Sequence, residues 1–205
     1  MAKANIQISS SRKNRNKIFR LGGILCLVTA ITGIILGGVY SITLEPIRRT
    51  RERLQNEALS GALPGAETFT PMELVSSLTN QGVQVQGVHR GSKGGETVGH
   101  SISVTSKGYG GAIQIVVGIA GDGTLHAIQI LSQSETPGLG AKASAPAFLR
   151  QYSNKKTESL TVVKAPPSAP GEIQAISGAT ITSNAVSDGV NAALAYWRTH
   201  LVGGK

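Results

Sequence analysis

The feature that most constrains this chain is an uninterrupted apolar run, because residues 21–44 contain no charged side chain. At about 1.5 Å of rise per residue, a helix of this length exceeds a hydrocarbon core of roughly 30 Å. The run ends without the small-x-small pattern at which a secretory signal is cleaved. We therefore predict an uncleaved transmembrane helix.

Three small residues of this run bear on its surroundings. Gly33 and Gly37 form a G-x-x-x-G pattern, which allows a second transmembrane helix to approach closely, although glycine is also common in such helices without a partner. The single cysteine, Cys26, lies early in the run. This position fits a small apolar residue better than a lipoprotein attachment site.

The basic charge of the chain is concentrated on the two flanks of the run. The formal net charge is +9, and beyond Arg53 acidic and basic residues nearly cancel. Four arginines follow the run, offset by Glu45 and Glu52, and the preceding flank is purely basic: Lys3, Arg12, Lys13, Arg15, Lys17 and Arg20. This distribution argues against nucleic-acid binding. It predicts a cytoplasmic N-terminus and an extracytoplasmic domain.

The remaining sequence divides into a stalk and one folded domain. We predict a basic cytoplasmic segment at 1–20, the transmembrane helix at 21–44, a juxtamembrane helix or stalk at 45–62, and an extracytoplasmic domain at 63–205. Leu63-Pro64-Gly65 ends the stalk. The stretch from Thr70 to Glu73 has the pattern of a capping box with proline at the first helical position, which predicts a short helix ending near Gly82.

The middle of the domain has the alternation typical of strands. Alternating runs occupy Val83–Val88, His100–Thr105 and Ile113–Ile119, and Gly121-Asp122-Gly123 predicts a tight hairpin leading into Leu125–Leu131. A short helix is expected over 146–152, with Phe148, Leu149 and Tyr152 facing inward. Apolar residues then recur at helical spacing at Val186, Val190, Leu194 and Trp197. These elements predict an α+β fold with an antiparallel sheet and a C-terminal helix.

Two loops of the domain are candidates for ligand binding. Ser177-Gly178-Ala179-Thr180 precedes the last helix, where free backbone N–H groups attract phosphate. The simpler interpretation is an ordinary helix start capped by Thr182, Ser183 or Asn184. The second loop, residues 135–142, carries a proline and two glycines and could line a flat or anionic ligand, although alone it indicates only a turn.

Other chemistries find little support in the sequence. His89, His100 and His126 stand singly within strands, without the clustered partners of a metal site. No nucleophile-elbow motif surrounds a serine. The chain also lacks a ferredoxin-type cysteine set and a dinucleotide-binding fingerprint.

Several motifs taken together resemble a known family. They are the N-terminal anchor, Leu63-Pro64-Gly65-Ala66, Gly108-Tyr109-Gly110-Gly111, Glu135-Thr136-Pro137-Gly138-Leu139-Gly140 and Ser177-Gly178-Ala179-Thr180. In this order they resemble the membrane-anchored FMN-binding G subunits of bacterial Rnf electron-transport complexes. A related family is formed by the C subunits of the sodium-translocating NADH:quinone reductase.

The resemblance implies a covalent flavoprotein. Thr180 would carry FMN through a phosphodiester bond formed by a flavin transferase on the outer face of the membrane. The phosphate would be held by Ser177, Gly178, Ala179 and Ile181. The rest of the cofactor would be bordered by Glu135, Thr136, Gly138, Leu139, Gly140, Tyr109 and Gly110.

The role implied is that of an electron-carrier subunit of an ion-translocating ferredoxin:NAD⁺ oxidoreductase. Its partners would be the other members of the complex and the lipid of a bacterial inner membrane, crossed once. Open alternatives are the quinone-reductase C subunit, an unflavinylated assembly or scaffold protein, and a membrane-tethered hydrolase. The chain departs from the family at Gln133 and Ser134, where members often have histidine.

Overall fold

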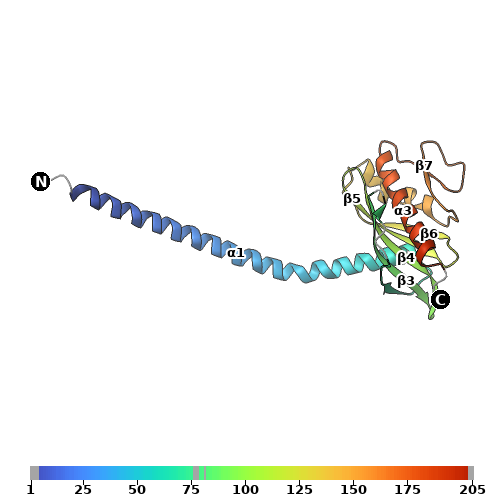
Figure 1. Cartoon of the computed structure of the whole chain (residues 1–205), viewed down its shortest axis with the longest axis horizontal. Coiled ribbons are helices and arrows are strands. Elements are labelled where there is room, and N and C mark those ends of the chain that lie inside the picture. Colours follow the sequence, from blue (N-terminus) through green and yellow to red (C-terminus); the bar gives the residue numbers. More distant parts are fainter. Residues whose placement is uncertain (1–4, 76–78, 81, 203–205) are drawn as a thin grey trace. The chain divides into compact units, whose positions relative to one another are not determined.

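The computed structural model describes residues 5–75, 79–80 and 82–202 (Figure 1). The chain forms two compact units, Met1–Glu52 and Arg53–Lys205. Most of the first unit is helix α1 (Asn5–Ala62), which from Phe19 onward is long and apolar enough to cross a membrane. Hydroxyl groups on this part of α1 donate to carbonyl oxygens about one turn earlier, at Thr29, Thr32, Ser41 and Thr43. These four hydroxyl groups are thereby satisfied within the helix.

The segment predicted as a helix or stalk is helical, because α1 continues through Pro46 and ends at Ala62. Oppositely charged side chains pair across single turns of this segment, as in Arg49 with Glu45 and Arg53 with Glu57. Such exposed pairs add only a few tenths of a kcal/mol each, about 0.3–0.5, to helix stability.

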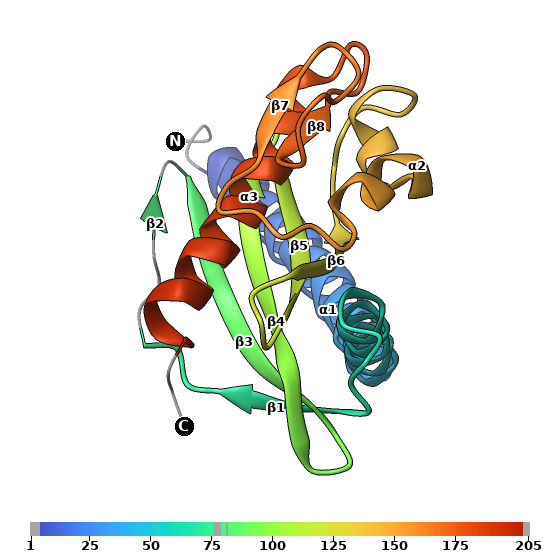
Figure 2. The ribbon, with the colours of Figure 1, turned by 90° about the vertical axis from the view of Figure 1, so that its right-hand side faces the viewer.

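The second unit is built on an antiparallel sheet of six strands. These are β1 (Thr68–Met72), β2 (Thr79–Asn80), β3 (Val83–Lys93), β4 (Glu96–Lys107), β5 (Ala112–Ala120) and β6 (Leu125–Ser132). The sheet order is β1-β3-β4-β5-β6, with β2 also paired to β3 (Figure 2). The predicted strands and the hairpin at Gly121–Gly123 are confirmed, and β3 and β4 run longer than the alternating segments that predicted them.

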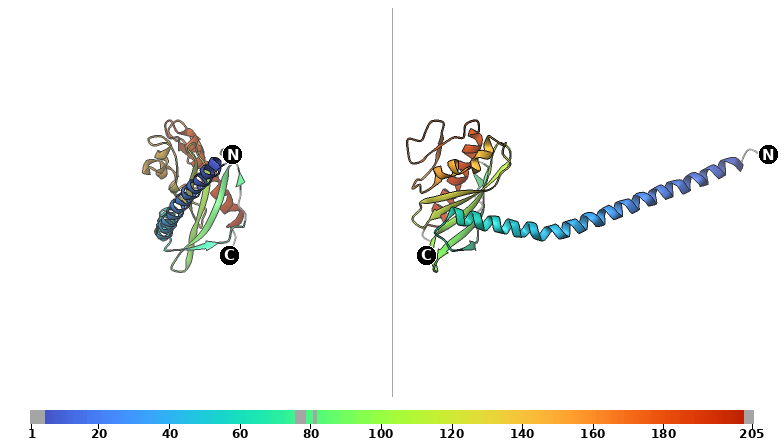
Figure 3. Two further views of the ribbon diagram at one scale, coloured as in Figure 1. Left: turned by 90° about the vertical axis from the view of Figure 1, so that its left-hand side faces the viewer. Right: turned by 180° about the vertical axis from the view of Figure 1, so that it is seen from behind.

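Helix α3 (Thr180–His200) covers one face of this sheet (Figures 2 and 3). The predicted apolar positions of α3 are all buried and pack against β-strand residues such as Ile102, Val104, Ile115 and Val117. Burial of large aliphatic side chains contributes roughly 1.5–3 kcal/mol each. The α+β fold and the C-terminal helix predicted from the sequence are therefore confirmed.

The last turns of α1 pack on the opposite face of the sheet. Ala58, Leu59 and Ala62 form a small buried cluster with Val116 of β5. Gly118 lies beneath the carbonyl oxygen of Ala62, so closely that a Cβ atom at Gly118 would overlap it. The end of α1 is thus fixed to the sheet by direct backbone contact.

Short elements connect β6 to α3. They are the 3₁₀ helix η1 (Gly140–Ser144), α2 (Pro146–Leu149), η2 (Arg150–Tyr152), and the parallel pair β7 (Thr161–Val163) and β8 (Glu172–Gln174). Phe148 and Tyr152 are buried as predicted and meet edge to face, with ring centroids 5.5 Å apart. The sequence patterns did not predict the parallel pair.

One predicted element is wrong. The segment from Thr70 to Met72 is part of strand β1, where Thr70 pairs with Arg90 and Pro71 pairs with His89. Proline is tolerated because β1 lies at the edge of the sheet. Pairing with β3 overrides the local helix signal, and residues 76–78 and 81 of the expected helix lie outside the described residues.

The contact between α1 and β5 predicts a strong effect of Gly118→Ala. The added methyl group must displace the Ala62 backbone, and such overpacking typically costs about 1–3 kcal/mol. Urea unfolding of the full chain in detergent, followed by the fluorescence of the single buried Trp197, would measure the change. Gly121→Ala is the matched control, because its nearest neighbour would lie at an ordinary 3.8 Å. Equal stability of the two variants would contradict this packing.

Candidate functional site

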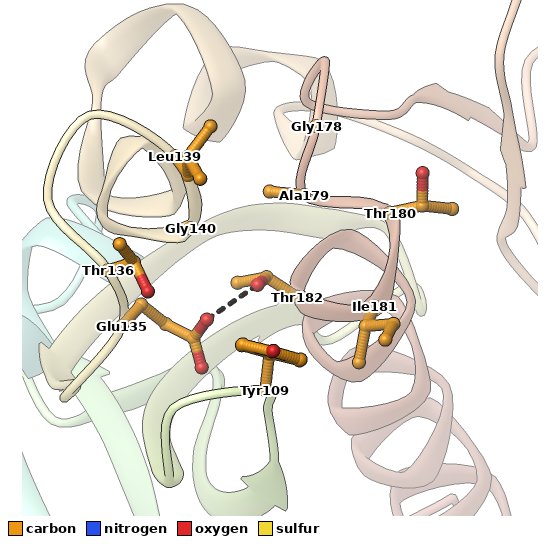
Figure 4. A pocket seen from close by; sticks show the side chains of 10 residues that line it. All are labelled: Tyr109, Glu135, Thr136, Leu139, Gly140, Gly178, Ala179, Thr180, Ile181 and Thr182. Carbon is orange, nitrogen blue, oxygen red and sulfur yellow. Dashed lines mark hydrogen bonds between the residues drawn. The ribbon is translucent and has the colours of Figure 1, made fainter.

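A cavity of about 500 Å³ lies where α3 begins (Figure 4). Three segments form its walls: the turn between β4 and β5, the loop that follows β6, and the first turn of α3. Its volume is within the range of cofactor sites, which is about 300–1,000 Å³. The lining residues are Tyr109, Glu135, Thr136, Leu139, Gly140, Gly178, Ala179, Thr180, Ile181 and Thr182.

Thr180 is the first residue of α3, and it is exposed at this cavity. Ala179 occupies the N-cap position, and within the described chain no side chain caps the helix start. The prediction that Thr182, Ser183 or Asn184 provides the cap is therefore wrong, because α3 begins earlier and these residues lie in its first turns. The backbone N–H groups of the first turn remain available to an anion.

Ser183 holds the turn before α3 in place. Its hydroxyl accepts a hydrogen bond from the Ile176 N–H at 2.9 Å and donates to the Ala179 carbonyl at 3.0 Å. The side chain is fully buried. Gly178 adopts a φ of +76°, a conformation that other residues rarely take. The turn that precedes Thr180 is therefore held by the hydrogen bonds of Ser183 and depends on the backbone conformation of Gly178.

Glu135 joins the three walls of the cavity. The residue is 6% exposed, and its carboxylate accepts hydrogen bonds from the Gly110 N–H at 2.9 Å and from the Thr182 hydroxyl at 2.6 Å. Its own N–H donates to the Gln133 side chain at 2.6 Å. Gly108 and Gly140 face the carboxylate so closely that a Cβ atom on either would overlap it. Glu135 thus has a site of its own, formed by two hydrogen-bond donors and two glycines.

The cavity carries no positive charge of its own. Among the described residues, no lysine, arginine or histidine lines it, and no ion pair involves Glu135. Large apolar side chains stand at its mouth instead: Tyr109 is 73% exposed, Ile181 57% and Leu139 45%. The site combines free helix N–H groups, an exposed hydroxyl, apolar side chains and one buried carboxylate.

The structure brings most of the predicted site residues together. Both candidate loops line one cavity, although they are separated in sequence by the elements from η1 to β8. Ser177, Gly138 and Gly110 do not line it; Gly110 instead donates to Glu135, and Gly138 turns the loop with a φ of +78°. Thr182 was overlooked as a lining residue, since its sequence signal pointed only to capping.

The strand histidines stay separate from this site. His89, His100 and His126 lie in β3, β4 and β6. Burial lowers the pKa of His89 and of His100, and Arg90 lowers that of His100 further. Within the described residues, no group of three histidine, cysteine, aspartate or glutamate side chains is placed to hold a metal ion.

Comparison with known proteins identifies the family of the domain that contains this cavity. The model of the FMN-binding domain family matches residues 108–195, which include both loops. The G subunit of the proton-translocating ferredoxin:NAD(+) oxidoreductase complex of Clostridium ljungdahlii is 37% identical over 193 residues, covering 94% of this chain and 98% of that protein. The G subunit of the corresponding Na(+)-translocating complex of Acetobacterium woodii is 35% identical over 184 residues, or 85% and 88% of the two chains.

Two solved structures share the fold. The C subunit of the Na(+)-translocating NADH-quinone reductase from Parabacteroides distasonis superposes with a TM-score of 0.51 at 26% identity, over 60% of this chain and 65% of that chain. NqrC from Shewanella oneidensis has a TM-score of 0.50 at 18% identity, over 67% and 70% of the two chains. The second likeness concerns the fold alone.

The hydrogen bonds of Ser183 predict a loss of stability in Ser183→Ala. The variant leaves the Ile176 N–H without its partner, and an unsatisfied buried donor costs about 1–3 kcal/mol. Urea unfolding of the full chain in detergent would measure this. Asn184→Ala, at the exposed neighbouring position on α3, should remain within about 0.5 kcal/mol of the wild type. A Ser183→Ala variant as stable as Asn184→Ala would argue against this role of Ser183.

Proposed function

The chain belongs to the family of G subunits of ion-translocating oxidoreductase complexes, and from this premise we propose that it is an electron carrier with FMN bound covalently to Thr180. As a redox protein it works within a larger complex. One observation carries the proposal: an exposed threonine hydroxyl stands at the uncapped start of a helix, on the wall of a cofactor-sized cavity.

The residues of the cavity fit FMN in three respects. The free N–H groups at the start of α3 suit the phosphate, since helix N-termini favour anions. The hydroxyl of Thr180 is exposed and can form the phosphodiester bond. The apolar side chains at the mouth, Tyr109, Leu139 and Ile181, suit a flat aromatic ring. When bound, the flavin supplies the electron-accepting chemistry, and the protein sets its position and surroundings.

Thr180 has an attachment role and takes no part as an acid, base or nucleophile during electron transfer. A covalent bond keeps the cofactor in the protein through every oxidation state, which suits a carrier exposed outside the cytoplasm. Gly178 and Ser183 hold the turn that keeps Thr180 at the cavity. Ser177, in the same turn, borders the phosphate. Gly138 and Gly110 act through the loops that they shape.

The place of the chain in the complex follows from its relatives. The two bacterial relatives described above are components of ferredoxin:NAD(+) oxidoreductase complexes that translocate protons or sodium ions. We propose that this chain accepts electrons from one redox partner in such a complex and passes them to another. Iron–sulfur clusters are held by several cysteines, and this sequence has one. The flavin is therefore its redox group.

We propose the same topology that the charges of the sequence favour. The basic N-terminal segment lies in the cytoplasm, residues 21–44 cross the inner membrane, residues 45–62 form the stalk, and the domain at 63–205 lies outside. Attachment of FMN by a flavin transferase then takes place on the outer side. Gly33 and Gly37 offer a contact to a neighbouring transmembrane helix.

Covalent attachment predicts a change of mass that depends on Thr180. We expect the full chain, co-expressed with a flavin transferase, to gain the mass of FMN less one water, and Thr180→Ala to gain nothing. Intact-mass spectrometry measures both. Thr199→Ala, on the exposed side of the same helix, should be flavinylated like the wild type. An unmodified wild type would favour the scaffold role instead.

The topology predicts which positions face the outside. In a Cys26→Ala background, Glu96→Cys should react with a membrane-impermeant maleimide in intact cells, since Glu96 is exposed on the domain. Ser10→Cys, on the N-terminal side, should react only after the membrane is permeabilised. Labelling in the reverse pattern would contradict an extracytoplasmic domain.

A further inference from the structure

We propose that the Glu135 carboxylate is a fixed, unpaired negative charge that lowers the reduction potential of the flavin attached at Thr180. This inference rests on the proposed function and assigns to Glu135 an electrostatic role beyond bordering the cofactor. The property concerned is the reduction potential of the flavin, which is measured at equilibrium.

The position of the carboxylate is firmly determined. Its two oxygens accept hydrogen bonds from different segments, one from the Gly110 backbone and one from Thr182 of α3. Since Glu135 also lines the cavity, a ligand that fills the cavity lies against this side chain (Figure 4).

The charge is also uncompensated. Buried carboxylates are normally paired with a cation, because burial of a lone charge is costly. In the part of the chain that the structure describes, Glu135 forms no ion pair, and the cavity lining contains no cationic side chain. A glutamine could accept from the Gly110 N–H and donate to the Thr182 hydroxyl without this cost, so stability alone does not account for a carboxylate here.

The surroundings are shaped to the carboxylate. Gly108 and Gly140 come from two different walls, and each approaches an oxygen of Glu135 where any larger residue would overlap it. The two glycines leave room for the carboxylate at the place where the hydrogen bonds of Gly110 and Thr182 hold it.

The effect on potential follows from charge repulsion. When the flavin accepts an electron from a reductant, the cavity gains one negative charge unless a proton follows. A fixed negative charge on the cavity wall disfavours that gain, and partial burial weakens the screening by water. The reduced form is therefore destabilised relative to the oxidised form.

Reductive titration of the flavinylated full chain tests this proposal. Dithionite supplies the electrons, redox dyes report the potential, and flavin absorbance reports the reduced fraction. We expect Glu135→Gln to shift the reduction equilibrium at least tenfold toward the reduced form, which is about 59 mV for a one-electron couple. Glu96→Gln removes the same charge at the end of β4 that lies away from the cavity, roughly 36 Å from the other end, and should leave the potential unchanged.

Thr182→Val separates charge from geometry. This variant breaks the hydrogen bond to α3 but retains the carboxylate, so we expect its potential to shift by less than that of Glu135→Gln. An upward shift in Thr182→Val equal to that in Glu135→Gln would overturn the proposal, because the role of Glu135 would then be structural. A shift below tenfold in Glu135→Gln, or a downward shift, would overturn it as well.

A second variant decides the matter if Glu135→Gln takes up no flavin. Thr136→Lys places a cation beside Glu135 at an exposed position of the same loop and leaves the carboxylate in place. We expect an upward shift of the potential, and an unchanged potential overturns the proposal, because charge on this wall of the cavity would then not reach the flavin. Failure of the proposed function itself is distinguishable, because the wild type would then lack the added mass before any titration.

Discussion

The packing of α3 against the sheet is the constraint on which the site depends. The apolar residues of α3 pack on side chains from β4 and β5. This packing fixes the rotation of the helix about its axis and its position along the sheet. Because the first residue of this helix is Thr180, the core also determines where that hydroxyl stands. The proposed attachment point is thus the first residue of a packed helix rather than part of a free loop.

Polar contacts of two residues, Ser183 and Glu135, then fix the segments around the start of α3. Ser183 reaches back to Ile176 and secures the turn that precedes the helix. Glu135 connects the first turn of α3 with the turn between β4 and β5, although Glu135 and Thr182 are 47 residues apart in sequence. Together these contacts bring the two loops to one cavity. Among the residues that the structure describes, the same arrangement leaves the Glu135 carboxylate without a cationic partner at the cavity wall.

The sequence predicted those elements whose pattern is local and regular. Alternation identified β3, β4 and β5, and helical spacing identified α3, because each of these elements buries one continuous face. The helix expected after Thr70 was wrong, since a capping pattern cannot reveal that the segment pairs with β3. For the site, motif resemblance selected both loops. It could not reveal that Thr182 and Gly110 both donate hydrogen bonds to Glu135, because these bonds form only when α3 packs against the sheet.

The chain belongs to the family of G subunits of ion-translocating oxidoreductases, and the electron carriage proposed for it depends on one covalent bond. The most direct test is fragmentation mass spectrometry of the peptide that contains Thr180, from protein purified out of its native membrane. We predict that this peptide carries FMN and that the fragments locate it on Thr180. A peptide found only in its unmodified form, or one with the flavin on another residue, would contradict covalent attachment at Thr180.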